Sequence, residues 1–104
     1  MKLATKMKLN EGMVEEYIRR HKKVFPDLEA EFIKAQVSDY TIWYDAETNH
    51  LFAYIVLEDI EVWNQIANTD ACKKWWKYMA PLMKTNSDYS PVSSELKLVY
   101  EFSK

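Results

Sequence analysis

Four stretches of the chain carry apolar residues in patterns that are typical of β-strands. Residues 2–9, 37–45 and 95–102 alternate between apolar and polar positions, which is typical of a strand with one buried face. Residues 50–58 are apolar on both faces, which indicates a strand that is covered on both sides. The turn-forming segment DAETN joins the second and third stretches, so we expect these two strands to form an antiparallel hairpin.

Four further segments repeat apolar residues every three or four positions, the spacing of one face of a helix. These predicted helices cover residues 12–23, 27–35, 59–67 and about 69–79. Pro26 separates the first two, because proline removes a backbone donor and suits the first turn of a new helix. Pro81 ends or kinks the last one, and either Thr69 or Asp70 is expected to cap its start.

The resulting order is β-α-β-β-α-β, with both helical regions interrupted. It predicts a ferredoxin-like split βαβ fold of the α+β class, in which helices cover one face of a four-stranded antiparallel sheet. A length of 104 residues suits a single domain over residues 1–104. Since the middle strands are apolar on both faces, the second face also needs a cover. A second copy packed sheet to sheet is the simplest one, so we expect a homodimer.

Composition and charge narrow the classes of function. The net charge of −2 argues against nucleic acid as a partner, because such proteins usually carry a basic face. No segment approaches the roughly 20 apolar residues of a membrane span, and no leader peptide is visible, so a cytoplasmic protein with no membrane partner is expected. The single cysteine, Cys72, excludes an internal disulfide and is expected to be a small buried apolar residue.

Candidate catalytic groups are few. No His, Cys or carboxylate spacing suits a metal, and a single glycine excludes a phosphate-binding glycine loop, so neither metal nor cofactor is expected. His21 lies one helical turn after Tyr17, and imidazole exchanges protons in both directions near neutral pH. The pair is a weak signal alone, because a helix C-terminus also favours histidine for its dipole. His50 lies at the predicted hairpin and is expected to be structural.

The aromatic residues are the strongest chemical feature. The chain has seven Tyr and four Trp, and each combines an apolar body with a polar tip. Trp75 and Trp76 are adjacent on a predicted helix and point about 100° apart, so both cannot face one narrow core stripe. The apolar faces of a pyranose pack on flat rings, while its hydroxyls need donors and acceptors. Tyr17, Tyr40, Trp75 and Trp76 can supply both, although core packing alone explains each of them nearly as well.

These segments together make the chain similar to a known family. It resembles the L-rhamnose mutarotase family over nearly its full length, in EEYIRRH (15–21), FPDLEA (25–30), DYTIWYDAETNHLFA (39–53), TDACKKWWKYMAPLM (69–83) and SPVSSEL (90–96). The resemblance implies a homodimeric α+β barrel that interconverts the anomers of L-rhamnose without cofactor or metal. It also implies that His21 is the proton donor and that the sugar is bound by Tyr17, Tyr40, Trp75 and Trp76.

The chain departs from the usual family pattern at three positions, namely Phe25, Ser87 and Tyr89. The larger ring at Tyr89 is expected to alter the rim of the pocket and thus the sugar preference. Two other functions remain open from the residues alone. One is a haem or quinone-type monooxygenase built on the same dimeric barrel, and the other is a non-catalytic module that binds sugar.

Overall fold

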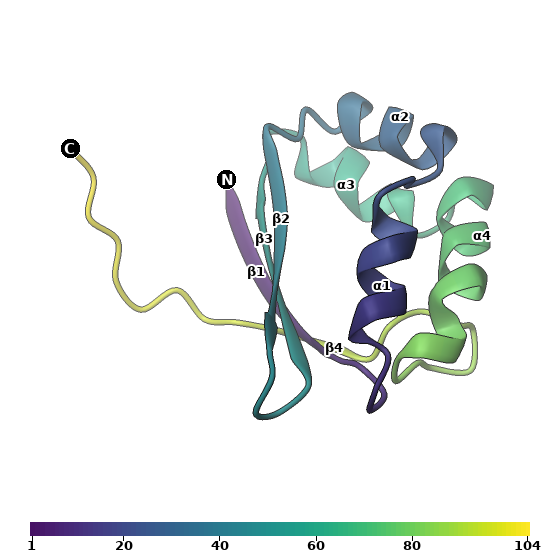
Figure 1. Ribbon diagram of the computed structural model, residues 1–104. Helices are drawn as coiled ribbons and strands as arrows, with labels where there is room; N and C mark the ends of the chain where they lie inside the picture. Colours follow the sequence, from purple (N-terminus) through teal and green to yellow (C-terminus); the bar gives the residue numbers. More distant parts are fainter.

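The computed structural model describes residues 1–104 and contains one antiparallel sheet with helices on one of its faces (Figure 1). The strands are β1 (Lys2–Lys8), β2 (Asp39–Asp45), β3 (His50–Val56) and β4 (Ser93–Glu95), and the helices are α1 (Val14–His21), α2 (Pro26–Lys34), α3 (Ile60–Ile66) and α4 (Asp70–Met79), followed by a 3-10 turn, Ala80–Leu82. The strand order β2-β3-β1-β4 is that of the ferredoxin-like fold, which confirms the predicted class.

The two faces of the central strand β3 have different surroundings. Leu51, Ala53 and Ile55 point toward the helices and are buried. The alternate residues Phe52 and Tyr54 lie on the opposite face and are half-buried. The expectation that this strand is apolar on both sides, with helices on only one, is therefore confirmed.

Local sequence signals account for the way the helices begin. Pro26 stands at the first position of α2, where its missing backbone donor costs nothing. The Thr69 hydroxyl caps α4 by accepting a hydrogen bond from the Cys72 backbone N–H at 3.2 Å. Ala71, Cys72, Trp75 and Met79 then form one buried helix face against the sheet.

The predicted strand over residues 95–102 is wrong for most of its length. Only Ser93–Glu95 pair with β1, and the last bond of this ladder runs from the Leu96 N–H to the Ala4 carbonyl. The register sets Thr5 opposite Glu95, so Leu98 would face Lys2, the first residue of β1. Residues 99–102 would lie beyond the end of β1 and have no strand to pair with. Figure 1 shows this segment running away from the sheet, on the side opposite the helices.

The sheet face opposite the helices carries exposed apolar side chains. Trp43 is 59% exposed there, next to Phe52 and Tyr54 across the ladder. This is the surface that the predicted homodimer would cover. No helix of the protein combines the length and the apolar character that a membrane span requires.

Candidate active site

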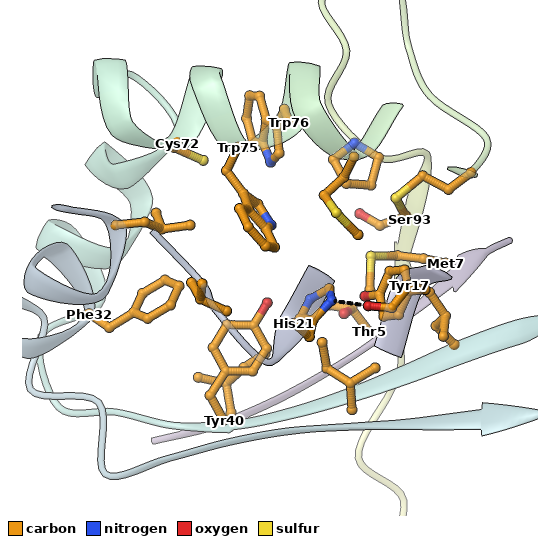
Figure 2. Close-up of a pocket in the computed structure, with 18 of the residues that line it drawn as sticks. Thr5, Met7, Tyr17, His21, Phe32, Tyr40, Cys72, Trp75, Trp76 and Ser93 are labelled. Atoms are coloured by element: carbon orange, nitrogen blue, oxygen red, sulfur yellow. Dashed lines mark hydrogen bonds between the residues drawn. The ribbon is translucent and has the colours of Figure 1, made fainter. Parts of the chain in front are cut away.

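A cavity of about 940 Å³ lies between the sheet and the helices. Its walls are mostly apolar, which is typical of pockets that bind small molecules. The lining includes all five residues that the sequence singled out, Tyr17, His21, Tyr40, Trp75 and Trp76 (Figure 2). They come from α1, β2 and α4, so the fold brings together side chains that are far apart in the sequence.

The hydrogen bond that His21 makes decides which of its nitrogens carries the proton. Its Nδ1 lies 2.9 Å from the carbonyl oxygen of Tyr17, one turn earlier in α1. A carbonyl oxygen only accepts, so Nδ1 must donate, and Nε2 of the neutral ring is left without a proton. The imidazole stacks on the Tyr17 ring at a centroid distance of 4.2 Å and meets Trp75 edge-on at 5.2 Å. These contacts fix both the tautomer and the orientation of His21.

Burial lowers the pKa of His21 below its ordinary value, because the enclosed site disfavours the charged ring. The hydrogen bond to the Tyr17 carbonyl opposes this lowering of the pKa only in part. At neutral pH the side chain is therefore neutral, with Nε2 available to accept a proton.

The two tyrosines of the site are held protonated. Burial raises the pKa of Tyr40 to about 12 and also raises the pKa of Tyr17. Although 38% of Tyr40 is exposed, its hydroxyl points into the cavity (Figure 2). Phe32 and Trp63 pack against its ring at 5.3 and 5.8 Å. At neutral pH both phenols are hydrogen-bond donors rather than bases.

The adjacent tryptophans occupy different surroundings, as their angular separation requires. Trp75 is only 8% exposed and belongs to the main core, where Phe25 packs edge-on against it at 4.9 Å. Trp76 is half-buried and lines the same cavity from the next position of the helix. The first ring is part of the core and of the pocket wall, and the second is free to contact a ligand.

Arg20 ties the helix that carries His21 to the helix that carries the tryptophans. Its guanidinium lies 4.3 Å from the centre of the Tyr78 ring and donates to the Tyr78 backbone carbonyl. It also donates to the Glu16 carboxylate at 2.7 Å. This contact holds α1 against α4, and thereby His21 against Trp75.

Some lining residues were missed by sequence reasoning. Thr5, Met7 and Ser93 border the cavity from the sheet (Figure 2). Thr5 could have been identified from the sequence, because it is a polar residue on the apolar face of its strand. Ser93 could not, because its segment shows no apolar periodicity. Cys72 also lines the cavity, where burial raises its pKa to about 11, so it is the inert apolar residue expected.

No group of three or more His, Cys, Asp or Glu side chains is placed to hold a metal ion. His50 lies at the start of β3, where its Nδ1 is 2.8 Å from the Thr48 hydroxyl. It does not line the cavity, in keeping with the structural role expected of it.

Tyr89 lines the cavity in a strained backbone conformation, with φ of +70°. In this backbone conformation a residue with a Cβ is destabilised by roughly 1 kcal/mol or more, whereas glycine is not. We therefore expect Tyr89→Gly to be more stable than Tyr89→Ala by about 1 kcal/mol, the reverse of the usual order of these two residues. Urea unfolding of the two variants measures the difference. If the alanine variant is the more stable, backbone strain at this position is refuted.

The fold and the cavity define the class of this protein. It is a small ferredoxin-like α+β protein whose aromatic pocket holds a neutral histidine and two protonated tyrosines. The chain belongs to the L-rhamnose mutarotase family, since the family model of that description matches residues 2–102. L-rhamnose mutarotase of Clostridium beijerinckii is 53% identical over 97 residues, which cover 93% of each chain. The crystal structure of L-rhamnose mutarotase from Formosa agariphila has a TM-score of 0.91 at 40% identity and covers 99% of each chain.

More distant structures share only the fold. A solved antibiotic biosynthesis monooxygenase has a TM-score of 0.62 at 8% identity, over 95% of this chain and 98% of that chain. This likeness shows the common ferredoxin-like architecture and no common chemistry. The comparison therefore supports a shared fold with monooxygenases but not a monooxygenase function. Membership of the mutarotase family is shown by sequence and structure together.

Proposed function

We propose that this protein interconverts the α and β anomers of L-rhamnopyranose, with His21 as the group that moves the proton. The observation that carries the proposal is the geometry of His21 within a chain of this family. Its Nδ1 is engaged by the Tyr17 carbonyl, its Nε2 is free, and its pKa is lowered. Flat rings and two phenol donors line the same cavity, as a sugar requires.

The reaction needs one proton removed and one delivered. The anomeric hydroxyl O1 loses its proton, the bond from C1 to the ring oxygen O5 breaks, and O5 gains a proton. The bond from C1 to C2 then rotates, and O5 attacks the other face of the aldehyde, giving up its proton to the base while O1 regains one. O1 and O5 are bonded to the same carbon, so one nitrogen can serve both. We infer that neutral His21 takes the O1 proton and, as imidazolium, acts as the proton donor to O5.

The other residues bind and orient the sugar. Tyr17 and Tyr40 remain protonated at neutral pH, so each can donate a hydrogen bond to a sugar oxygen. Trp75 forms a fixed wall beside His21, and Trp76 offers a ring face to the apolar side of the sugar. Together they also exclude bulk water from the reacting oxygens.

We propose no metal or cofactor for this reaction. Sugars mutarotate spontaneously in water, so the enzyme needs only to accelerate the proton transfers. A positioned imidazole can do this by acid–base catalysis. The ring opens and closes without a change of oxidation state, so no redox group is required. We place the reaction in the cytoplasm, which is what the sequence predicted.

Saturation-transfer NMR on L-rhamnose tests the proposed function. Saturating one anomeric proton should reduce the signal of the other in the presence of protein, well beyond the spontaneous exchange. A panel of other sugars then measures the preference that Tyr89 is expected to influence. Binding of rhamnose with exchange at the spontaneous rate would instead support a sugar-binding module. A Soret band, or oxygen uptake with an aromatic substrate, would support a monooxygenase.

The lowered pKa of His21 sets the expected pH dependence. The neutral ring is the form that starts the reaction, so catalysed exchange should be constant above the ordinary histidine pKa of about 6.5. It should fall only as the pH drops through the lower pKa of the folded protein. The exchange rate, corrected for the spontaneous reaction at each pH, is compared with an NMR titration of the His21 ring. A rate that rises with acid would mean that imidazolium is the starting form.

We further propose that two copies associate through the sheet face opposite the helices. Trp43, Phe52 and Tyr54 place apolar side chains on that face, and a two-fold axis would set the same patch of each copy against the other. Sedimentation equilibrium measures the resulting mass, and a monomer at micromolar concentration would contradict this assembly.

A further inference from the structure

Two side-chain hydroxyls on the sheet side of the cavity make no hydrogen bond within the protein. They belong to Thr5 of β1 and Ser93 of β4, and both residues line the cavity (Figure 2). Other hydroxyls of the chain are used internally, since those of Thr48, Thr69 and Ser90 each donate to a nearby oxygen. An unpaired hydroxyl in a mostly apolar wall is a place where a polar group of a ligand can bind.

Both hydroxyls are accessible from the cavity. No fully buried side-chain oxygen of the chain lacks a hydrogen-bond partner, so the unpaired Thr5 hydroxyl is not enclosed by protein. Ser93 is exposed, and Figure 2 shows its hydroxyl directed toward the interior of the cavity. Ala53 pairs with Thr5 from the neighbouring strand β3, and its small side chain leaves the hydroxyl uncovered on that side.

The strand register places the two hydroxyls near each other. Met7 pairs with Ser93 across the ladder between β1 and β4, and Thr5 precedes Met7 by two residues, on the same face of the sheet. Thr5 and Ser93 are therefore diagonal neighbours, with Cα atoms roughly 7–8 Å apart. No hydrogen bond joins the two side chains, so each can bind a separate oxygen of one small ligand.

The backbone holds both residues in place. Thr5 lies in an inner strand that is paired on both sides, with β3 and with β4. Ser93 is held from both directions, because the N–H groups of Val92 and Leu96 donate to carbonyl oxygens at 3.0 and 2.8 Å. Groups that are fixed before a ligand arrives bind it without an ordering cost, so these hydroxyls can discriminate between ligands.

A sugar in this cavity needs acceptors as well as donors, because each of its hydroxyls has a proton to donate. The phenols of Tyr17 and Tyr40 stay protonated and donate, and Nε2 of His21 accepts from the anomeric hydroxyl in the proposed reaction. The remaining ring hydroxyls also need partners. A serine or threonine hydroxyl suits them, because it can accept and donate at the same time.

We propose that Thr5 and Ser93 determine the sugar specificity, each by binding one ring hydroxyl other than the anomeric one. This inference rests on the proposed function and names the part of the sugar that the sheet recognises. His21 projects from α1 in the helix layer, so the anomeric end of the sugar faces the helices. Its other hydroxyls then face β1 and β4. A pyranose that lacks one of these hydroxyls leaves Thr5 or Ser93 unpaired and binds less well.

The variants Thr5→Val and Ser93→Ala test the proposal, because each removes a hydroxyl with little change in shape. Saturation-transfer NMR at a series of L-rhamnose concentrations should show KM raised roughly three- to tenfold, with kcat changed little. Thr5→Ser restores a hydroxyl and should recover most of the loss. Ser94→Ala is the matched control, because Ser94 is exposed and does not line the cavity. An unchanged KM in Thr5→Val or in Ser93→Ala would overturn the role of that residue.

Deoxy sugars show whether a hydroxyl is what each residue recognises. Derivatives of L-rhamnose that lack the 2-, 3- or 4-hydroxyl are compared in the wild-type protein and in both variants. For each variant, one derivative should bind no more weakly than it binds to the wild type, and this derivative should differ between the two variants. An equal loss for every sugar would indicate disturbed packing and would overturn the proposal. Calorimetry with the same sugars measures binding whether or not exchange is catalysed, so failure of the proposed reaction is distinguished from failure of this inference.

Discussion

The variant His21→Ala is expected to lose catalysed anomer exchange by roughly 10²–10⁴-fold, the range that a positioned acid–base group contributes. The loss follows from the geometry, since His21 is the cavity residue with a free ring nitrogen and a pKa below its ordinary value. Tyr17 and Tyr40 cannot replace it as a base at neutral pH, because their raised pKa values keep both phenols protonated.

Saturation transfer between the two anomeric protons measures this loss, and circular dichroism shows whether the variant remains folded. His50→Ala is the matched control, because His50 does not line the cavity and should leave the exchange unchanged. His21→Gln retains a similar shape and an amide that can donate to the Tyr17 carbonyl, so it separates the loss of the base from the loss of packing. Exchange at the wild-type rate in both His21 variants would remove His21 from the mechanism.

Most of the fold followed from local patterns, because each correctly predicted element had a clear local signal. Alternation marked β1 and β2, and a run that is apolar on both faces marked β3. Pro26 marked the start of α2, and the capping residues Thr69 and Asp70 marked the start of α4. The failure over residues 95–102 has a physical cause. Alternation indicates that a segment is extended, but it does not say which sheet receives it. The pairing register with β1 reaches the first residue of that strand at Leu98, and nothing in the pattern marks this limit.

The candidate site was predictable in part. Tyr17 and His21 share a helix face at a spacing of four residues, so their proximity follows from helical geometry. The approach of Tyr40 and Trp75 depends on how β2 and α4 pack, and the sequence implied it only through the family resemblance. The tautomer of His21 and the lowering of its pKa depend on a carbonyl partner and on burial, and neither is visible in a pattern of residue types.

Replacement of the two tryptophans by alanine should lower the stability of the protein by very different amounts. Trp75→Ala removes a core ring that contacts Phe25, His21 and Tyr78, so it should lower the free energy of unfolding by about 3–5 kcal/mol. Trp76→Ala removes a half-buried ring at the cavity and should cost roughly 1 kcal/mol or less of stability, as substitutions outside the core usually do. This pair of results would assign Trp75 to the core and would leave Trp76 for contact with the ligand.

The kinetics of Trp76→Ala complete the distinction. If this ring stacks on the sugar, its loss should raise KM about tenfold, which corresponds to about 1.4 kcal/mol of binding, and should change kcat little. Urea unfolding followed by far-UV circular dichroism gives the stabilities without relying on the tryptophan signal that the variants remove. A fall in kcat at constant KM would mean that Trp76 acts on the reacting oxygens instead. Equal losses of stability in both variants would mean that both rings belong to the core.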